Sequence, residues 1–332
     1  MREILDHNHK PIENYERKDE LKKLVDSVRD FVLGICPEEW KPIVQKNYEK
    51  FDFIIAEKGT GSYNLVRNGN QVQKNLDGAG AYCFMDNYDS EKNTCNFSSV
   101  IDHKATVRQI VHELMHGLSA DMFETETEKV VKFGSTRQTI TKGKEGVVAT
   151  GSESLNEGIT EVLTEWYMGG AKGALTGTSG YGPEVILAHL FTGSEIKNNA
   201  FIQDVYFGDG KKFAEKFNAK VSDPNTTFDS YLNKNSFNFN NLKNLPLFQS
   251  AIECTLKRAK TPEQVKAEIS FMQNILNQAD NFLGVADENI VETLTKFINE
   301  VSQKHLESLK SSSEDESERK VVPRLQPALG LV

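Results

Sequence analysis

Apolar residues recur at helical spacing in several parts of the chain. The pattern is clearest over 18–34, 262–279 and 287–309, where apolar positions follow one another at intervals of three or four residues. This period places the apolar side chains on one face, so each stretch predicts an amphipathic helix that packs against a core. Shorter helices are expected over these ranges: 37–50, 185–191, 196–205, 210–219 and 225–234.

Runs of β-branched and aromatic residues predict strands in the first half of the chain. The runs FDFIIA at 51–56 and YNLV at 63–66 are two candidates. GAGAYCFMD and TCNFSSV, separated by the turn-rich NYDSEKN, predict a hairpin within 78–100. Residues 122–150 predict a second β-rich segment, with a hairpin turn at Gly134-Ser135 and a further strand at GVVAT.

These elements together predict an α+β fold. A small mixed or antiparallel sheet with its helices forms a core at 51–200, preceded by a helical segment at 1–50 that is irregular up to residue 17. A mostly α-helical C-terminal subdomain follows at 201–310. The last part, 311–332, is polar and then contains two prolines, so it is expected to be a disordered tail.

The stretch 105–121 carries the residues with the clearest chemistry. It reads ATVRQIVHELMHGLSAD and contains His112, Glu113 and His116 in the arrangement H-E-x-x-H. On a helix, positions i and i+4 lie about 40° apart, so the two imidazoles point the same way, as sharing one metal ion requires. Glu113 lies beside them, where it can act as a general base on a metal-bound water. The apolar residues of this helix fall on the opposite side: Val107, Ile110, Val111, Leu114 and Leu118.

A second helix, predicted over about 154–168, supplies a third ligand. Glu157 and Glu161 are four residues apart and share one face, while apolar residues occupy the other. Catalytic zinc usually takes three protein ligands and keeps one open position, so Glu157 completes the set. The alternative is that Glu157 caps its own helix in an S-x-x-E box beginning at Ser154, with Glu161 and Glu165 on a solvated face.

HELMH followed by NEGITE at 156–161 resembles the gluzincin class of zinc metallopeptidases, of which thermolysin is the type. The resemblance extends from the hairpin at residue 78 to the end of the second helix. It implies a zincin-like catalytic core and Zn²⁺ as the cofactor. It also implies that His112, His116 and Glu157 are the zinc ligands and that Glu113 is the general base.

The same resemblance assigns roles to residues around the ligands. Glu161 would orient His112, because zinc-bound imidazoles normally donate their other N–H to a carboxylate or carbonyl. Asn156, directly before the ligand glutamate, is expected to support the ligands as well. Tyr181 and His189 are candidates for the donor that stabilises the oxyanion, although residues of these types are more often packing residues than catalytic ones.

The chain departs from the thermolysin pattern at two points. Thermolysin-type enzymes have an aspartate where Glu161 stands, so the reach of this carboxylate differs. The interval between His116 and Glu157 is also longer, which makes 122–150 an insertion peculiar to this chain or its near relatives. The third histidine of the metzincins, expected shortly after Gly117, is absent, and this favours a glutamate as the third ligand.

The predicted hairpin at 78–100 comes directly before the histidine helix. An edge strand beside a metal site can hold an extended peptide by backbone pairing, and Gly78 and Gly80 would let a substrate backbone approach closely. An ordinary structural hairpin is the alternative.

Composition excludes several classes of function. The formal net charge is −9 and no stripe of lysine and arginine is present, so no nucleic-acid partner is expected. No run of 18 apolar residues occurs, so no membrane span is expected. The four cysteines include no C-x-x-C pair, which favours reduced thiols, with a Cys83–Cys95 disulfide as the alternative.

The N-terminus has no apolar signal segment, and the composition is rich in Lys and Asn, so we expect a bacterial cytoplasmic protein. Export by a route that needs no signal peptide is the alternative. The function expected from the paired motif is a zinc metallopeptidase, of the endopeptidase kind, that acts on a protein or peptide substrate. The alternative from another class is a non-catalytic zinc-binding interaction protein on the same scaffold.

Overall fold

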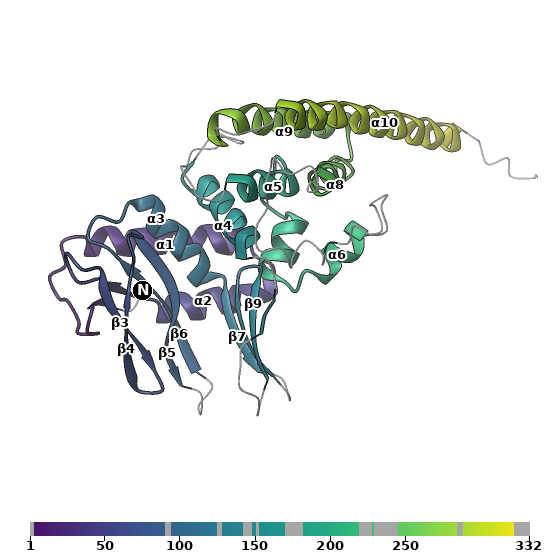
Figure 1. The fold of residues 1–332 in the computed structure, drawn as a ribbon. Coiled ribbons are helices and arrows are strands. Elements are labelled where there is room, and N and C mark those ends of the chain that lie inside the picture. Colours follow the sequence, from purple (N-terminus) through teal and green to yellow (C-terminus); the bar gives the residue numbers. More distant parts are fainter. Residues whose placement is uncertain are drawn as a thin grey trace, which may run out of the picture.

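The structure is a computed structural model in which these residues are described: 3–89, 94–124, 128–141, 148–150, 153–169, 182–218, 228, 245–283 and 288–321 (Figure 1). The fold is mixed α/β, with two small sheets and a helical C-terminal region. The predicted combination of small sheets with C-terminal helices is therefore confirmed.

The larger sheet has six strands in the order β1-β2-β6-β5-β3-β4. Their bounds are β1 (Ile4–Asp6), β2 (Asp52–Ile55), β3 (Ser62–Arg67), β4 (Asn70–Asn75), β5 (Ala81–Asp89) and β6 (Thr94–Ile101). β1, β2 and β6 run parallel, whereas β5 pairs antiparallel with β6 as the predicted hairpin. The prediction that residues 1–17 are irregular is wrong at β1, because Ile4 and Leu5 pair with β2 and are buried there.

The second sheet is a four-stranded antiparallel meander within the insertion. Its strands are β7 (Ala120–Glu124), β8 (Glu128–Phe133), β9 (Thr136–Thr141) and β10 (Val148–Thr150). The turn between β8 and β9 lies at Gly134-Ser135, as the sequence predicts. Gly134 has a φ of +52°, a left-handed conformation that glycine adopts without steric cost.

The helices carry most of the remaining chain. Their bounds are α1 (Lys18–Ile35), η1 (Glu38–Trp40), α2 (Lys41–Lys50), α3 (Val107–Leu118), α4 (Glu153–Tyr167), α5 (Gly182–Thr192), the π-helix η2 (Ile202–Phe207), α6 (Lys211–Asn218), α8 (Leu245–Leu256), α9 (Pro262–Leu283) and α10 (Glu288–Val321). The helix predicted over 225–234 lies outside the described residues except for Phe228. α8 was not predicted, because its run LPLFQSAIECTL is mostly apolar and shows little helical period.

One hydrophobic cluster joins the first helix to the last. Val25 of α1, Leu114 of α3 and Leu294 of α10 are all fully buried members of it. In Figure 1, α9 and α10 lie beyond α5 and α8, on the far side from the six-stranded sheet. The segments separated in the sequence-based division therefore share a core.

The end of α10 differs from the predicted tail. The helix continues to Val321, so the part of the predicted disordered segment before residue 322 is helical, and 322–332 lies outside the described residues. The sequence SSSEDESERK contains neither proline nor glycine, and extending an existing helix is much less costly than nucleating one.

Two further expectations are tested by the fold. Among the helices of the described ranges, none combines the length and apolarity needed to cross a membrane. Cys83 lies opposite Ser99 in the sheet and is a free thiol, which contradicts the alternative of a Cys83–Cys95 disulfide.

Candidate metal centre

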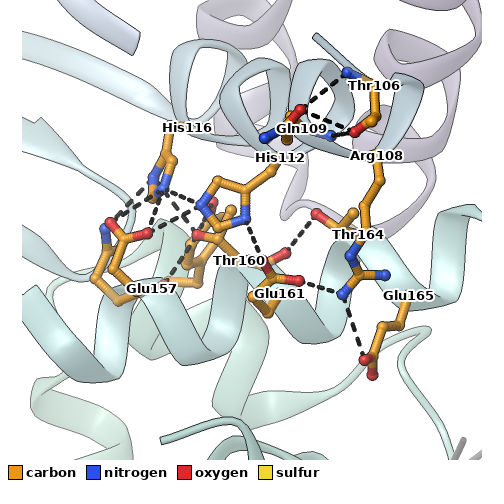
Figure 2. A network of polar contacts seen from close by, with 12 residues as sticks. Thr106, Arg108, Gln109, His112, His116, Glu157, Thr160, Glu161, Thr164 and Glu165 are labelled. Atoms are coloured by element: carbon orange, nitrogen blue, oxygen red, sulfur yellow. Dashed lines mark hydrogen bonds and ion pairs between the residues drawn. The ribbon is translucent and has the colours of Figure 1, made fainter. Parts of the chain in front are cut away.

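The site is formed by two helices that run in opposite directions past each other. α3 presents Arg108, His112 and His116 at intervals of four residues, and α4 presents three glutamates at the same interval, Glu157, Glu161 and Glu165. His116 contacts Glu157 at one end and Arg108 contacts Glu165 at the other, as Figure 2 shows. Because residues four apart share a helix face, the two rows of side chains face each other along about two turns.

Local sequence explains how α3 is held. Thr106 caps the helix, since its hydroxyl accepts from the Gln109 N–H while the Gln109 side chain accepts from the Thr106 N–H. Of the predicted apolar stripe, these residues are fully buried: Ile110, Val111, Leu114 and Leu118; Val107 is exposed. At Gly117, directly after the motif, a Cβ would stand 2.3 Å from the Phe51 ring and 3.2 Å from the sulfur of Cys83 in β5, so only glycine lets α3 approach these two residues this closely.

Three side chains converge on one point. His112 Nε2 lies 2.9 Å from Glu157 Oε2, the Nε2 atoms of His112 and His116 are 3.1 Å apart, and His116 Nε2 lies 3.2 Å from Glu157 Oε1. All three are mostly buried, with 8–18% of each side chain exposed. Tetrahedral zinc with bonds of about 2.0 Å requires ligand atoms roughly 3.3 Å apart, so the spacing fits one such ion.

The pKa values of His112 and Glu157 shift in opposite directions. Burial alone would lower the pKa of His112, but the contacts with Glu157 and Glu161 outweigh it and raise the pKa to about 10. Burial would also raise the pKa of Glu157, yet the two imidazoles hold it well below its usual range. In the metal-free protein, His112 therefore carries a second proton, whose positive charge lies next to Glu157, where a metal cation would also be favoured.

Glu113 does not join the ligands and points to the sheet instead. Its Oε2 accepts a hydrogen bond of 2.6 Å from the backbone N–H of Cys83 in β5. Burial raises the pKa of this carboxyl, and the charges of the nearby imidazoles oppose the rise. A carboxylate with a raised pKa, fixed beside the ligand group, has the properties of a general base.

A chain of ion pairs continues from His112 along the two helices. His112 Nδ1 lies 3.1 Å from Glu161 Oε1, and the other oxygen of Glu161 forms a very short contact with Arg108. Arg108 also lies 3.5 Å from Glu165, whose second oxygen accepts from His189 Nε2 at 2.8 Å. Glu161 and Glu165 are buried, so the alternative of a solvated face is wrong. Burial would raise the pKa of Glu161, but His112 and Arg108 lower it.

The other ring nitrogen of His116 faces a second set of polar groups. Asn156 Nδ2 lies 3.4 Å and Thr160 Oγ1 lies 3.5 Å from His116 Nδ1. The amide of Asn156 is oriented by the β8–β9 turn, because its Oδ1 accepts from the backbone N–H of Ser135 at 2.8 Å. Thr160 Oγ1 lies 3.1 Å from the hydroxyl of Tyr206 in the π-helix. The insertion therefore reaches the site through its hairpin turn.

The structure brings together most of the residues that the sequence predicts. His112, His116 and Glu157 form the only three-residue group of potential metal ligands within the described ranges. Glu161 contacts His112 and Asn156 contacts His116, as expected. Glu157 lies one turn into α4, which begins at Glu153, and it contacts the histidines, so the capping alternative is wrong.

The two candidates for the oxyanion donor have different outcomes. Tyr181 lies outside the described residues. His189 is 1% exposed and packs between Glu165 and the ring of Phe271. The Gln109 side chain, and not a substrate backbone, occupies the space beside Gly80, because a Cβ at Gly80 would stand 2.4 Å from it. This contact supplies a structural reason for Gly80.

The sequence did not predict that four further residues lie at the site: Arg108, Glu165, Thr160 and Tyr206. For Arg108 and Glu165 a signal was present, because Arg108 precedes His112 by four residues and Glu165 follows Glu161 by four. Tyr206 is distant in sequence and carries no motif, so only the fold places it at the site.

Comparisons with protein-family models, with characterised proteins and with solved structures found no match for this chain. The assignment of a function therefore depends on the geometry of the site.

Proposed function

We propose that this chain is a zinc-dependent metallopeptidase of the gluzincin type. The observation that carries the proposal is the convergence of His112, His116 and Glu157 on one point, with Glu113 fixed beside them and outside the ligand set. Two imidazoles and one carboxylate form the donor set of catalytic zinc in this class, and the separations of 2.9 to 3.2 Å between the ligand atoms suit that ion.

The electrostatics of the site also favour a divalent cation. Within this group of side chains four carboxylates stand against one guanidinium: Glu113, Glu157, Glu161 and Glu165 against Arg108. With neutral imidazoles, as metal binding requires, the group has up to three excess negative charges in a largely buried region. A divalent cation on the three candidate ligands would offset two of these charges, whereas a proton on His112 offsets one, so the charge of the site favours the cation.

The chemistry then divides among the residues. A bound zinc ion would polarise the scissile carbonyl and activate a water at its open position. Glu113 would accept the proton of the attacking water and pass it to the leaving amine, because its carboxyl is held next to the candidate ligands with a raised pKa. The hydrogen bond from Cys83 holds Glu113 in this position.

The position of β5 supports a peptide substrate. Between Ala81 and Met85 the strand pairs with β6 on one side, while the N–H of Cys83 points away from β6 towards Glu113. β5 lies between β6 and β3, and its one register pair with β3 in the described residues is at Tyr88. An extended peptide could pair with the other backbone groups on this side of β5 between Ala81 and Met85, which would bring its carbonyl past Glu113. The free thiols of Cys36, Cys83 and Cys254 fit the reducing cytoplasm expected from the sequence.

The direct test is a comparison of the zinc-loaded wild type with Glu113→Gln on a proteome-derived peptide library, with N-terminal labelling of the products. We expect new N-termini with the wild type, and a loss of at least roughly 10²-fold in cleavage rate with the variant, because the general base is removed. The variant should still bind one zinc ion, since Glu113 is not a ligand. Glu263→Gln, on the exposed side of α9, is the matched control and should cleave like the wild type.

The same experiment distinguishes the proposed peptidase from the alternative function, a non-catalytic zinc-binding protein. A non-catalytic zinc-binding protein would hold one zinc ion through His112 and would produce no new N-termini in either form. Absence of zinc from the wild type, with no change in the His112→Ala variant, would contradict both.

A further inference from the structure

The ion pairs beyond His112 lead to a role for Arg108. The side chain lies one turn before His112 on the same face of α3, and it meets the carboxylate of Glu161 that faces His112 Nδ1. It lies outside the ligand group and outside the H-E-x-x-H motif, so the proposed reaction gives it no part. Figure 2 shows its guanidinium between Glu161 and Glu165.

We propose that Arg108 is a positioning residue that fixes the carboxylate of Glu161 against His112 and thereby sets the metal affinity of the site. This inference rests on the metal site of the proposed function, but it does not depend on the reaction being peptide hydrolysis.

Geometry supports this role in three steps. A glutamate has three side-chain torsions, so its carboxylate needs an anchor to hold one position against a ring nitrogen. Arg108 supplies that anchor through one oxygen of Glu161 and leaves the other oxygen, 3.1 Å from Nδ1, for the imidazole. The imidazole then keeps its proton on Nδ1 and offers the Nε2 lone pair to a metal, which is the tautomer that zinc requires.

The anchor is itself held in place. Arg108 also lies 3.5 Å from Glu165, and Glu165 is hydrogen bonded to His189 on α5. The Glu165 side chain is 4% exposed, that of Glu161 11% and that of Arg108 26%, so the guanidinium sits at the rim and the carboxylates lie deeper. Partly buried ion pairs of this kind are screened less than surface pairs, and removing one partner leaves a buried charge uncompensated.

The experiment measures zinc affinity by competition with a chromophoric chelator. For Arg108→Gln we expect an affinity roughly 10- to 100-fold below that of the wild type, the usual effect of losing a partner just outside the ligands. Arg108→Lys, which keeps the charge without the planar fork, should fall between the two. Arg29→Gln is the matched control, because Arg29 has a similar exposed fraction and pairs with Asp30 away from the site.

A double variant distinguishes positioning from general destabilisation. If Arg108 acts through Glu161, Arg108→Gln should weaken zinc binding no further once Glu161→Gln is present. Wild-type affinity in Arg108→Gln, or additive losses in the double variant, would overturn the inference.

A metal-free measurement keeps the inference separate from the proposed function. In the protein treated with chelator, the Nδ1 proton of His112, observed by ¹H–¹⁵N NMR of the imidazole, should exchange faster with water in Arg108→Gln than in the wild type. Equal exchange rates would contradict the role of Arg108 even if the wild type binds zinc. Conversely, a wild type that binds no zinc but shows the faster exchange in the variant would overturn the metal site and the effect of Arg108 on metal affinity, and would support only its positioning of Glu161 against His112.

Discussion

At the scale of single residues, the protonation state of His112 decides whether its Nε2 atom can bind a cation. The ring lies between the carboxylates of Glu157 and Glu161, one on each nitrogen. The two carboxylates stabilise the imidazolium form of the ring, which explains why the pKa of His112 is raised to about 10 despite burial. A metal must therefore displace a proton, so metal binding and pH are linked.

The sign of this linkage gives a prediction for the metal-free protein. A raised histidine pKa stabilises the fold fully below the unfolded value of 6.5, and that contribution is lost as the pH rises towards about 10. The lowered pKa of Glu157 acts oppositely, so its contribution is lost as the pH falls below its ordinary value of 4.5. Thermal unfolding in the presence of chelator should thus show a Tm that decreases as the pH rises above about 6.5.

Zinc should reverse this trend, because binding competes with the proton on His112. The increase in Tm between chelator and a fixed free zinc concentration should grow as the pH is raised from 6 to 8.5, at roughly constant ionic strength. An increase that is the same at every pH would show that His112 is not protonated in the metal-free site. His112→Ala, which removes the titrating group, should lose the pH dependence together with the zinc effect.

At the scale of elements, the site depends on how closely α4 approaches α5. Gly158 follows the candidate ligand Glu157 directly, and a Cβ at this position would stand 2.5 Å from the backbone carbonyl oxygen of Glu184 in α5. Backbone cannot rotate aside as a side chain can, so any larger residue must push the helices apart. That displacement would move Glu157 relative to the two histidines on α3.

Gly158→Ala is therefore expected to destabilise the protein by about 1–3 kcal/mol, the usual cost of overpacking a tight interior. Urea unfolding measures it, and zinc affinity should fall in parallel. Gly34→Ala is the control: Gly34 is exposed near the end of α1 with no neighbour within 4 Å, and alanine there should be neutral or stabilise by up to about 1 kcal/mol. Equal effects of the two substitutions would contradict the packing argument.

The elements also show what the sequence could and could not predict. Helical period predicted α1, α3, α4 and α9 because each buries one stripe, and the interval of four residues predicted that His112 and His116 would share a face, as the structure shows. β4 was missed because its side chains are all exposed and, apart from Val72, polar, so it has no alternation to detect. The pairing of Glu165 with His189 joins two helices across 24 residues, and no local pattern encodes that contact.

At the scale of the whole molecule, the C-terminal helices belong to the same core as the site. Phe191 of α5 packs among the aromatic rings of Phe201, Phe213 and Phe228, all within the cluster that contains Leu114 of α3. α5 also carries His189, the last member of the ion-pair chain that begins at His112. The position of the ligand helices is thus tied to packing that lies far along the chain.

Truncation of α10 tests this dependence. Ile290, Leu294 and Ile298 are buried in the common cluster, and exposing three such side chains costs roughly 4–9 kcal/mol. This is comparable with the whole stability of a typical domain, about 5–15 kcal/mol. Ending the chain after Ala286 should therefore abolish cooperative unfolding and zinc binding together, as followed by calorimetry and chelator competition.

Ending the chain after Lys310 removes none of these side chains and should leave both cooperative unfolding and zinc binding unchanged, because Ser302 is the last buried residue of the described part of α10. Retention of zinc binding by the shorter chain would instead show that the ligand helices fold without α10, and that the C-terminal helices form a separate unit.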